Sequence, residues 1–291
     1  MNTRAIIAVL LIVLAAIALI AHLSTTTIEF SRYNGDWTGT SGLFADLDAR
    51  GARDLVSYDD LAGRNDTLFL IIAPNSSFPA GEAAALRRFL EDGNTVVIAD
   101  ETGVANDLLE RLGSSIRIQP GDISSTEMEF FDYWSVIVYP RHDDPLLANV
   151  SAITLNRPSA VNGGESLVRT TLLSWDDTNA NYHLDANETL SSFSILAREP
   201  VGRGTLYVFS DPSIFVNGMR QARLTSDNAV FTKNLLSLQS GILVDQSHSL
   251  TGGADAVLAT AIWVKNTMVI KISALIVSLL LVAVAFWRRW I

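Results

Sequence analysis

Two apolar runs lie at the ends of the chain, and each is long enough to cross a membrane. Residues 5–21, AIIAVLLIVLAAIALIA, carry no charge, and residues 268–287 carry one, Lys271. About 17 to 20 apolar residues span the hydrocarbon core of a bilayer, and a lysine near the start of a run can extend its amino group to the interface. The pattern therefore predicts membrane anchors over residues 5–23 and 267–287.

The basic residues beside these runs predict their orientation. Arg4 precedes the first run, and Arg288 and Arg289 follow the second. Because basic flanks stay on the cytoplasmic side, both termini are expected in the cytoplasm, and residues 24–266 are expected outside the cell. A cleaved signal peptide is the alternative for the first run, but AHLS at 21–24 is a poor cleavage site.

The first half of the segment between the anchors alternates between strand and helix patterns. Apolar runs at 26–31, 54–58, 67–73 and 95–100 predict strands, and helices that stop at Gly51, Gly93 and Gly113 are expected near them. Alternation of this kind is typical of βαβ units. We expect an α/β fold in which helices sandwich a parallel or mixed sheet.

The middle of the chain changes character. Strand-like segments follow one another without long helices at 134–140, 152–155, 166–175 and 192–199. An antiparallel or mixed extension of the sheet, a β-rich insertion at about 133–200, is therefore expected. A strand-and-helix pattern returns at 202–218 and 227–238. The predicted organisation is a cytoplasmic N-terminus 1–4, an anchor 5–23, one domain 24–244, a stalk 245–266, an anchor 267–287 and a cytoplasmic tail 288–291.

Composition narrows the possible chemistry. The chain contains no cysteine, which excludes disulfides, a thiol nucleophile and a thiolate metal site. It carries 21 basic and 31 acidic residues, a formal net charge of −10, and all the acidic residues lie between the predicted anchors. This excess of negative charge argues against nucleic acid as a partner. Sequons at Asn65, Asn75, Asn149 and Asn187 would be glycosylation acceptors in a host with that machinery.

Polar residues follow the predicted strands, where an open parallel sheet binds ligands. The ligand-binding candidates are Tyr33, Asn34, Asn75, Asp100, Glu101, Asp211 and Asn217. The alternative is that each is an ordinary turn former or helix cap. The nearby stretch GDWTGTSG, at 35–42, lacks the lysine and the spacing of a phosphate loop, so we expect Thr40 or Ser41 to cap a helix there.

The most polar stretch of the chain, DTNANYHLDANE at 177–188, has the spacing of an EF-hand calcium loop. The candidate ligands are Asp177, Asn179, Asn181, His183, Asp185 and Glu188. Tyr182 stands where such a loop has glycine, and the preceding segment is strand-like. Two interpretations stay open, a calcium-binding loop between strands and an Asx-rich turn that bonds to its own backbone.

Several segments resemble known families. VVIADETGVANDLLERLG, at 96–113, is similar to the strand, nucleophile elbow and helix of class I glutamine amidotransferase-like domains. The segments 31–51, 208–219 and 227–236 resemble the membrane-anchored DUF4350 family, which is similar in fold to gliding-motility and ABC-transporter accessory proteins. The resemblance implies a flavodoxin-like sandwich and no particular activity.

The chain departs from the enzymes of this fold at the elbow. An amidotransferase needs a cysteine that a histidine activates, whereas the elbow here is Asp-Glu-Thr-Gly. Of the four histidines, His22 is expected at the membrane edge, His142 and His183 in polar turns, and His248 in the stalk. No triad is recognisable in the sequence, so amidotransfer is excluded.

Three functions follow from these observations. The first is a non-catalytic binding or assembly module, anchored in the lipid bilayer of the cell membrane, that binds a small ligand or a partner protein of a transport or envelope complex. The second is a metal-assisted hydrolase that uses Asp100, Glu101 and Asp211 around a cation. The third is a structural envelope protein stiffened by calcium in its loop. The one cofactor candidate from the sequence is Ca²⁺.

Overall fold

The computed structural model describes residues 12, 26–119, 121–127, 132–220, 226–252 and 286–287. Both predicted anchors therefore lie outside the described residues, apart from Ile12, Phe286 and Trp287. Within the part of the chain that is described, no helix is long and apolar enough to cross a bilayer. Residues Ile28–Gly253 form one compact unit.

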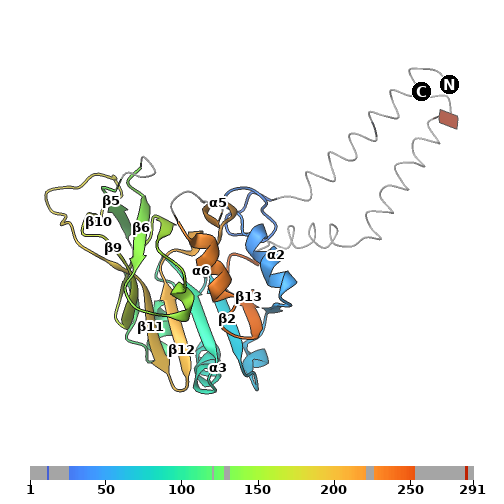
Figure 1. Ribbon diagram of the computed structural model, residues 1–291. Coiled ribbons are helices and arrows are strands. Elements are labelled where there is room, and N and C mark those ends of the chain that lie inside the picture. The colour runs from blue at the N-terminus through green and yellow to red at the C-terminus, as the bar shows by residue number, and fades with distance from the viewer. Residues whose placement is uncertain are drawn as a thin grey trace. The chain divides into compact units, whose positions relative to one another are not determined.

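A nine-stranded mixed sheet runs through this body (Figure 1). Its strands lie in the order β1 (Arg53–Leu55), β13 (Gly241–Asp245), β2 (Thr67–Ile72), β3 (Thr95–Ala99), β12 (Gly204–Phe209), β11 (Ser194–Val201), β9 (Glu165–Thr170), β6 (Ser135–Pro140) and β7 (Ile153–Asn156). The first five are parallel to one another, and the last four extend the sheet in antiparallel pairs. The mixed sheet predicted from the sequence is confirmed.

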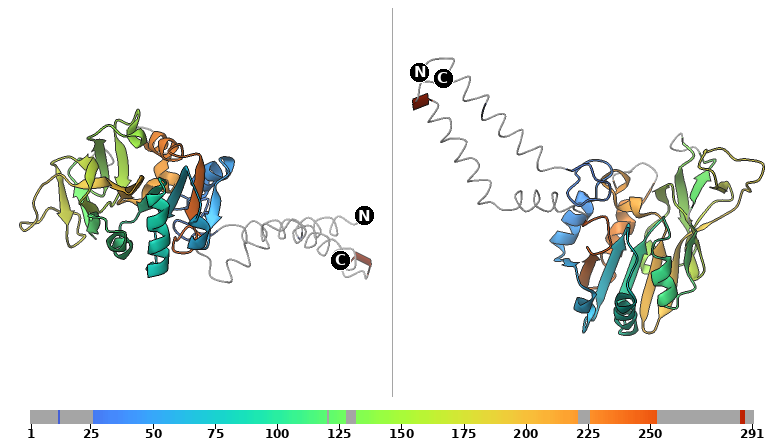
Figure 2. Two further views of the ribbon diagram at one scale, coloured as in Figure 1. Left: turned by 90° about the horizontal axis from the view of Figure 1, so that it is seen from below. Right: turned by 180° about the vertical axis from the view of Figure 1, so that it is seen from behind.

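Helices cover both faces of the sheet, as Figures 1 and 2 show. The helices α2 (Ser41–Ala49), α5 (Asn217–Arg220) and α6 (Asn228–Leu235) contribute to one hydrophobic core, and α3 (Ala80–Glu91) and α4 (Asn106–Arg111) contribute to the other. Short 3-10 helices η1 (Tyr58–Leu61), η2 (Pro145–Leu147) and η3 (Pro212–Phe215) complete the connections.

The central strand β2 shows why the sheet is buried on both faces. Its side chains alternate, so that Leu68, Leu70 and Ile72 enter one core while Phe69 and Ile71 enter the other. Successive side chains of a strand point to opposite faces, and each large apolar side chain that is fully buried contributes about 1.5–3 kcal/mol. A strand that is buried on both faces, such as β2, therefore needs apolar side chains at every position.

Two small sheets lie beside the main one. The strands β5 (Asp122–Ser125) and β10 (Ser174–Asp177) form an antiparallel pair, and so do β4 (Arg117–Gln119) and β8 (Ala160–Asn162). The single strand predicted at 166–175 is therefore two strands. Residues 171–173 turn away from the main sheet between them, which leaves Leu172 and Leu173 exposed.

The strand predicted at 26–31 is wrong. Phe30 has a φ of 57°, a left-handed conformation outside the β region, and residues 26–31 form no strand. Its N–H donates to the carbonyl of Thr38 (3.0 Å), and the Thr40 hydroxyl donates to the carbonyl of Phe30 (2.7 Å). These contacts fold the segment back on itself, so local strand propensity gives way to a compact turn.

Residues 245–252, expected as the start of a stalk, instead belong to the body. β13 ends at Asp245, and the chain that follows donates from Gln246 N–H to the carbonyl of Leu55 (2.9 Å) and from Leu250 N–H to the carbonyl of Ala73 (3.0 Å). The apolar segment 241–245 is therefore a fifth parallel strand, and the residues after it continue along the sheet edge.

Asn228 provides a test of how the edge strand β7 is joined to the helices α5 and α6. Its fully buried side chain accepts from Thr154 N–H (2.9 Å) and donates to the carbonyls of Thr154 (2.8 Å) and Met219 (3.1 Å). Replacing it with alanine leaves buried backbone groups unpaired, so Asn228→Ala is expected to lower the free energy of unfolding in urea by about 1–3 kcal/mol. The exposed Asn187→Ala is the control, with an expected change below about 0.5 kcal/mol. Equal losses in the two variants would contradict this role.

Candidate functional site

The carboxyl ends of the five parallel strands meet at one edge of the sheet, where open α/β sheets bind ligands. The structure places four of the sequence candidates at this edge. Asn75 lies after β2, Asp100 and Glu101 directly follow β3, and Asp211 follows β12. β3 and β12 are neighbouring strands, so Glu101 and Asp211 come close to each other.

The carboxylates of Asp100 and Asp211 are fully buried and are bonded to the backbone. Asp100 accepts from the N–H groups of Thr102 (2.7 Å) and Ala105 (2.8 Å), which shapes the turn into α4. Asp211 accepts from the N–H groups of Ser213 and Asn156, each at 2.7 Å. Both residues therefore have structural roles as turn and cap residues, the alternative that the sequence left open.

Glu101 is different, because its side chain is half-buried and no hydrogen bond from its carboxyl group is found within the described residues. Burial raises the pKa of Glu101 to about 8, and the negative charge of Asp211 adds to the effect. Burial also raises the pKa of Asp211 to about 7, against the lowering effect of its hydrogen bonds. The edge at β3 and β12 therefore holds a proton near neutral pH.

Asn34 and Asn217 lie together: Asn34 bonds within its own turn, and Asn217 bonds to that turn and to α2. Asn34 is buried, with its amide donating to the carbonyl of Ile28 (3.0 Å). Asn217 donates to the carbonyl of Asp36 (2.8 Å) and accepts from Gly42 N–H (2.9 Å) in the first turn of α2. The cap of α2 thus comes from Asn217 in α5. The prediction that Thr40 or Ser41 caps this helix is wrong, because Thr40 bonds elsewhere.

Two further candidates, Tyr33 and Asn75, have side chains that are not fully buried. Tyr33 is half-buried, with the guanidinium of Arg32 placed 5.9 Å from the centre of its ring. Asn75 is exposed, and its backbone N–H donates to the carbonyl of His248 (2.8 Å). Asn75 therefore marks the point at which the turns after β2 and β13 meet.

The loop 177–188 connects β10 to β11 and bonds mainly to itself. Asp177 is buried and accepts from the N–H groups of Asn181 (3.1 Å) and Tyr182 (2.7 Å). Asp185 accepts from the side-chain amides of Asn179 (2.8 Å) and Asn181 (3.0 Å). The loop thus shows the local side-chain bonding of an Asx-rich turn.

The two ends of the same loop are joined by its last residue. Glu188 accepts from the N–H groups of Thr178 and Asp185, each at 3.0 Å, and His183 N–H donates to the side chain of Asn181 (2.7 Å). Tyr182 takes the left-handed conformation, with a φ of 60°, at the position where an EF-hand has glycine. Whether the loop also binds calcium stays a prediction.

No arrangement of three or more histidine, aspartate or glutamate side chains in the described residues could hold a metal ion. This holds for the strand-end carboxylates, where Asp100 and Asp211 point their oxygens at backbone donors. The metal-assisted hydrolase suggested by the sequence therefore gains no support from the geometry.

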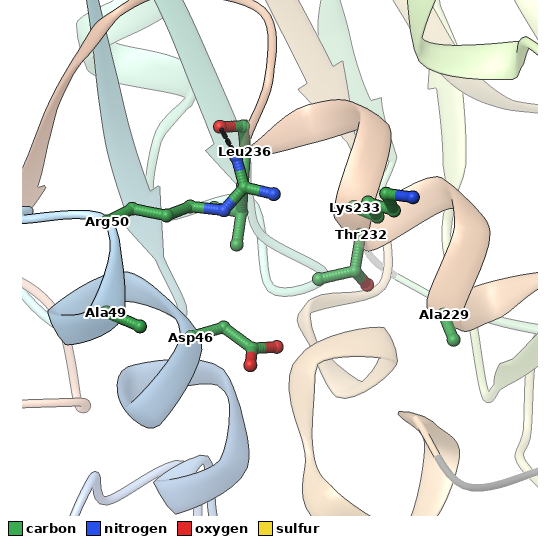
Figure 3. Close-up of a pocket in the computed structure, with 7 residues that line it drawn as sticks. All are labelled: Asp46, Ala49, Arg50, Ala229, Thr232, Lys233 and Leu236. Carbon is green, nitrogen blue, oxygen red and sulfur yellow. Dashed lines mark hydrogen bonds between the residues drawn. The ribbon is translucent and has the colours of Figure 1, made fainter.

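A groove of about 310 Å³ lies between α2 and α6, on a helical face of the sheet (Figure 3). The guanidinium of Arg50 reaches across it to the carbonyl of Leu236 (2.8 Å), and Asp46 pairs with Arg220. The groove is lined by Asp46, Ala49, Arg50, Ala229, Thr232, Lys233 and Leu236. The Arg50 contact therefore joins the end of α2 to the end of α6 beside the groove.

Sequence reasoning missed a polar group at the strand-end edge. His248, expected in a stalk, is only 7% exposed and lies between Ser76 and Glu82, within hydrogen-bonding distance of both. The signal that could have revealed it is the apolar segment 241–245. Recognising that segment as the last parallel strand would have placed His248 at the carboxyl edge.

The fold and its edge define a class of protein, an α/β body built on a mixed sheet with polar side chains at the carboxyl ends of its parallel strands. Within that class, the chain belongs to the family described as a domain of unknown function, DUF4350, whose model matches residues 32–236. No curated protein matches the sequence.

Among solved structures, the fold is similar to the mmIFT52 N-terminal domain, with 14% sequence identity and a TM-score of 0.52 over 69% of this chain and 90% of that one. A cytoplasmic protein from Salmonella typhimurium LT2 matches at 9% identity and a TM-score of 0.40, over 69% and 87% of the chains. A β-galactosidase from Bacillus circulans sp. alkalophilus matches at 14% identity and 0.32, over 51% and 21%. The first likeness shows the fold alone.

The acidic pair at the edge predicts a pH dependence of stability. The pKa of Glu101 is raised from 4.5 to about 8 in the folded protein, so the folded state holds a proton that the unfolded state releases between these values. Stability therefore falls as the pH rises through this window. We expect Glu101→Gln to melt at least about 2–4 °C above wild type at pH 9, the shift that 1 kcal/mol produces in a domain of this size. The exposed Glu110→Gln is the control and should melt as wild type does. If Glu101→Gln also melts at the wild-type temperature at every pH, the raised pKa of Glu101 is contradicted.

The calcium interpretation of the loop is tested by thermal melting with and without Ca²⁺. If the loop binds the ion, millimolar Ca²⁺ is expected to raise the melting temperature of wild type, because a ligand that binds only the folded state stabilises it. The increase should be absent in Asp177→Ala and in Glu188→Ala. If wild type has the same melting temperature with Ca²⁺ and with a chelator, the calcium interpretation is contradicted and the loop is an Asx-rich turn that bonds to itself.

Proposed function

We propose that the protein is a membrane-anchored module of amidotransferase-like fold that holds its body outside the cell and binds a small polar ligand or a partner protein at the carboxyl edge of its sheet. Membership of the DUF4350 family supports this proposal. So do the apolar runs at both ends of the chain and the basic residues beside them. Such a module would serve a transport or envelope complex.

The position of Asp100 supports a role without amidotransferase chemistry. It follows β3, where the resemblance places the nucleophile elbow, and its carboxylate is fully used in holding the turn into α4. With no cysteine in the chain, the covalent step of an amidotransferase has no thiol to begin from.

The main support for a binding role is the environment of the Glu101 side chain. Its carboxyl group is half-buried and has a raised pKa, and no hydrogen bond of its carboxyl oxygens is found among the described residues. Such groups are concentrated at functional sites. Protonated at neutral pH, Glu101 can donate from its O–H and accept at its carbonyl oxygen, so it can pair with a polar group of a ligand or partner.

The proposal is tested by affinity capture of the intact protein from its native membrane after cross-linking. The amount of co-purified ligand or partner is expected to be about tenfold lower with Glu101→Ala than with wild type, which corresponds to a loss of about 1.4 kcal/mol of binding free energy. The exposed control Glu110→Ala should capture the same amount as wild type. Glu101→Gln should retain most of it, since an amide keeps both a donor and an acceptor. Equal capture by all of these variants, each of them folded, would refute the role of this edge.

A further inference from the structure

Three side chains from separate segments meet at the carboxyl end of β2 and β13. The hydroxyl oxygen of Ser76 lies 3.0 Å from Nδ1 of His248, and Nε2 of the same ring lies 2.7 Å from Oε2 of Glu82. Ser76 is in the connection from β2 to α3, Glu82 is in the first turn of α3, and His248 follows β13. They meet because β13 and β2 are adjacent parallel strands.

The imidazole of His248 is held from several sides. The ring of Phe78 lies against it at a centroid distance of 4.3 Å, and Tyr58 meets it edge-on at 5.7 Å. The backbone N–H of His248 donates to Asp245 (3.0 Å), which is itself fully buried. The orientation of the ring is therefore fixed by packing and by backbone hydrogen bonding.

The turn that carries Ser76 is bonded to the turn that carries His248. Asn75 N–H donates to the carbonyl of His248 (2.8 Å), and Ile72 N–H donates to the hydroxyl of Ser249 (3.2 Å). Pro74 and Ser249 also form an antiparallel bridge. These contacts fix the distance between the serine and the imidazole before any ligand arrives.

The protonation of the ring follows from its two partners. An ionised glutamate only accepts hydrogen bonds, so the Nε2 that faces Glu82 carries a proton. In the neutral imidazole Nδ1 then has a free lone pair, which can accept from the Ser76 hydroxyl. A serine hydroxyl bonded to an imidazole base that a carboxylate orients is the arrangement of an activated nucleophile.

We propose that Ser76, His248 and Glu82 form a serine-based acyl-transfer site whose substrates are carboxylic esters or amides. Ser76 is the nucleophile, His248 is the general base and Glu82 is the residue that orients and charge-stabilises the imidazole. This inference goes beyond the binding role above and does not depend on Glu101. It gives the edge a chemistry that the absence of cysteine had seemed to remove.

The reaction balances with water as the second reactant. Ser76 Oγ bonds to the carbonyl carbon of the substrate while its proton passes to His248 Nδ1. The bond from that carbon to the alcohol or amine breaks, and the leaving group takes the proton from Nδ1. Water, deprotonated by His248, then attacks the acyl-serine, which releases the carboxylic acid and returns the proton to Ser76.

Access and charge stabilisation both suit this role. Ser76 is exposed although His248 is buried, so a carbonyl group can reach the hydroxyl while the base stays shielded from water. α3 begins four residues after Ser76, and no side chain caps its N-terminus. The positive end of the α3 dipole favours negative charge at this end of the helix.

The test is labelling of the full-length protein, in detergent, with a fluorescent alkyl fluorophosphonate. Wild type is expected to be labelled at Ser76, identified by mass spectrometry of the modified peptide. Ser76→Ala should lose the label, while the adjacent and equally exposed Ser77→Ala should keep it. His248→Gln should slow labelling by about 10²–10⁴-fold, the usual contribution of a positioned base, and Glu82→Gln should slow it as well.

Hydrolysis of a p-nitrophenyl ester provides a second readout with the same variants. Turnover is expected in wild type and in Ser77→Ala and should be absent in Ser76→Ala, whose exposed site makes the substitution harmless to folding. Melting temperatures show whether the His248 variant is folded. Failure of the probe to label wild type, or equal labelling of wild type and Ser76→Ala, would overturn the acyl-transfer site. Neither result affects the affinity-capture test of the binding role of Glu101.

Discussion

The insertion of β13 between β1 and β2 is the contact on which the parallel half of the sheet depends. β13 comes from the end of the body in sequence, yet it pairs with β1 through residues such as Leu243 and with β2 through residues such as Val244. Its side chains also enter both cores. Without this strand, β1 would have no partner and the inner edge of β2 would carry unpaired N–H and carbonyl groups, which is costly in a buried strand.

The same strand supplies the buried carboxylate that organises the neighbouring turns. Asp245 accepts from the N–H groups of Ser247 (3.2 Å) and His248 (3.0 Å), from the Ser249 hydroxyl (2.9 Å) and from the Tyr58 hydroxyl (3.4 Å). Burial, and then the charge of Asp245, raise the pKa of Tyr58, so the phenol stays protonated and remains a donor. Four donors offset the cost of burying one carboxylate, and the arrangement fixes the backbone on which the imidazole is mounted.

Much of the fold could be predicted from the sequence because its strongest patterns are local. β2 and β3 are continuous apolar runs, and α3 ends at a glycine, so their spans follow from periodicity and turn chemistry alone. β13 was missed because its five residues lie between polar segments and gain their stability from two distant strands. The failure at 26–31 has a similar cause, since contacts with Thr38 and Thr40 override the strand propensity of TTIEFS.

The candidate site shows the same division between local and distant information. That polar residues gather at the carboxyl edge follows from the parallel topology, but the role of each depends on partners far away in the chain. Asn217 caps α2 across 175 residues of sequence, and Ser76 meets His248 across 172. No spacing rule within a single segment encodes either pair, so their roles emerge only when the strand order is known.

The proposed nucleophile Ser76 lies beside a turn whose carboxylate is fully engaged. Asp100 occupies the turn after β3, with both carboxylate oxygens bonded to the backbone. The connection after β2 is one strand away along the same edge. It receives a histidine from β13 and a carboxylate from α3, so the requirement for a base beside the nucleophile is met at the neighbouring strand, by residues that the topology itself brings together.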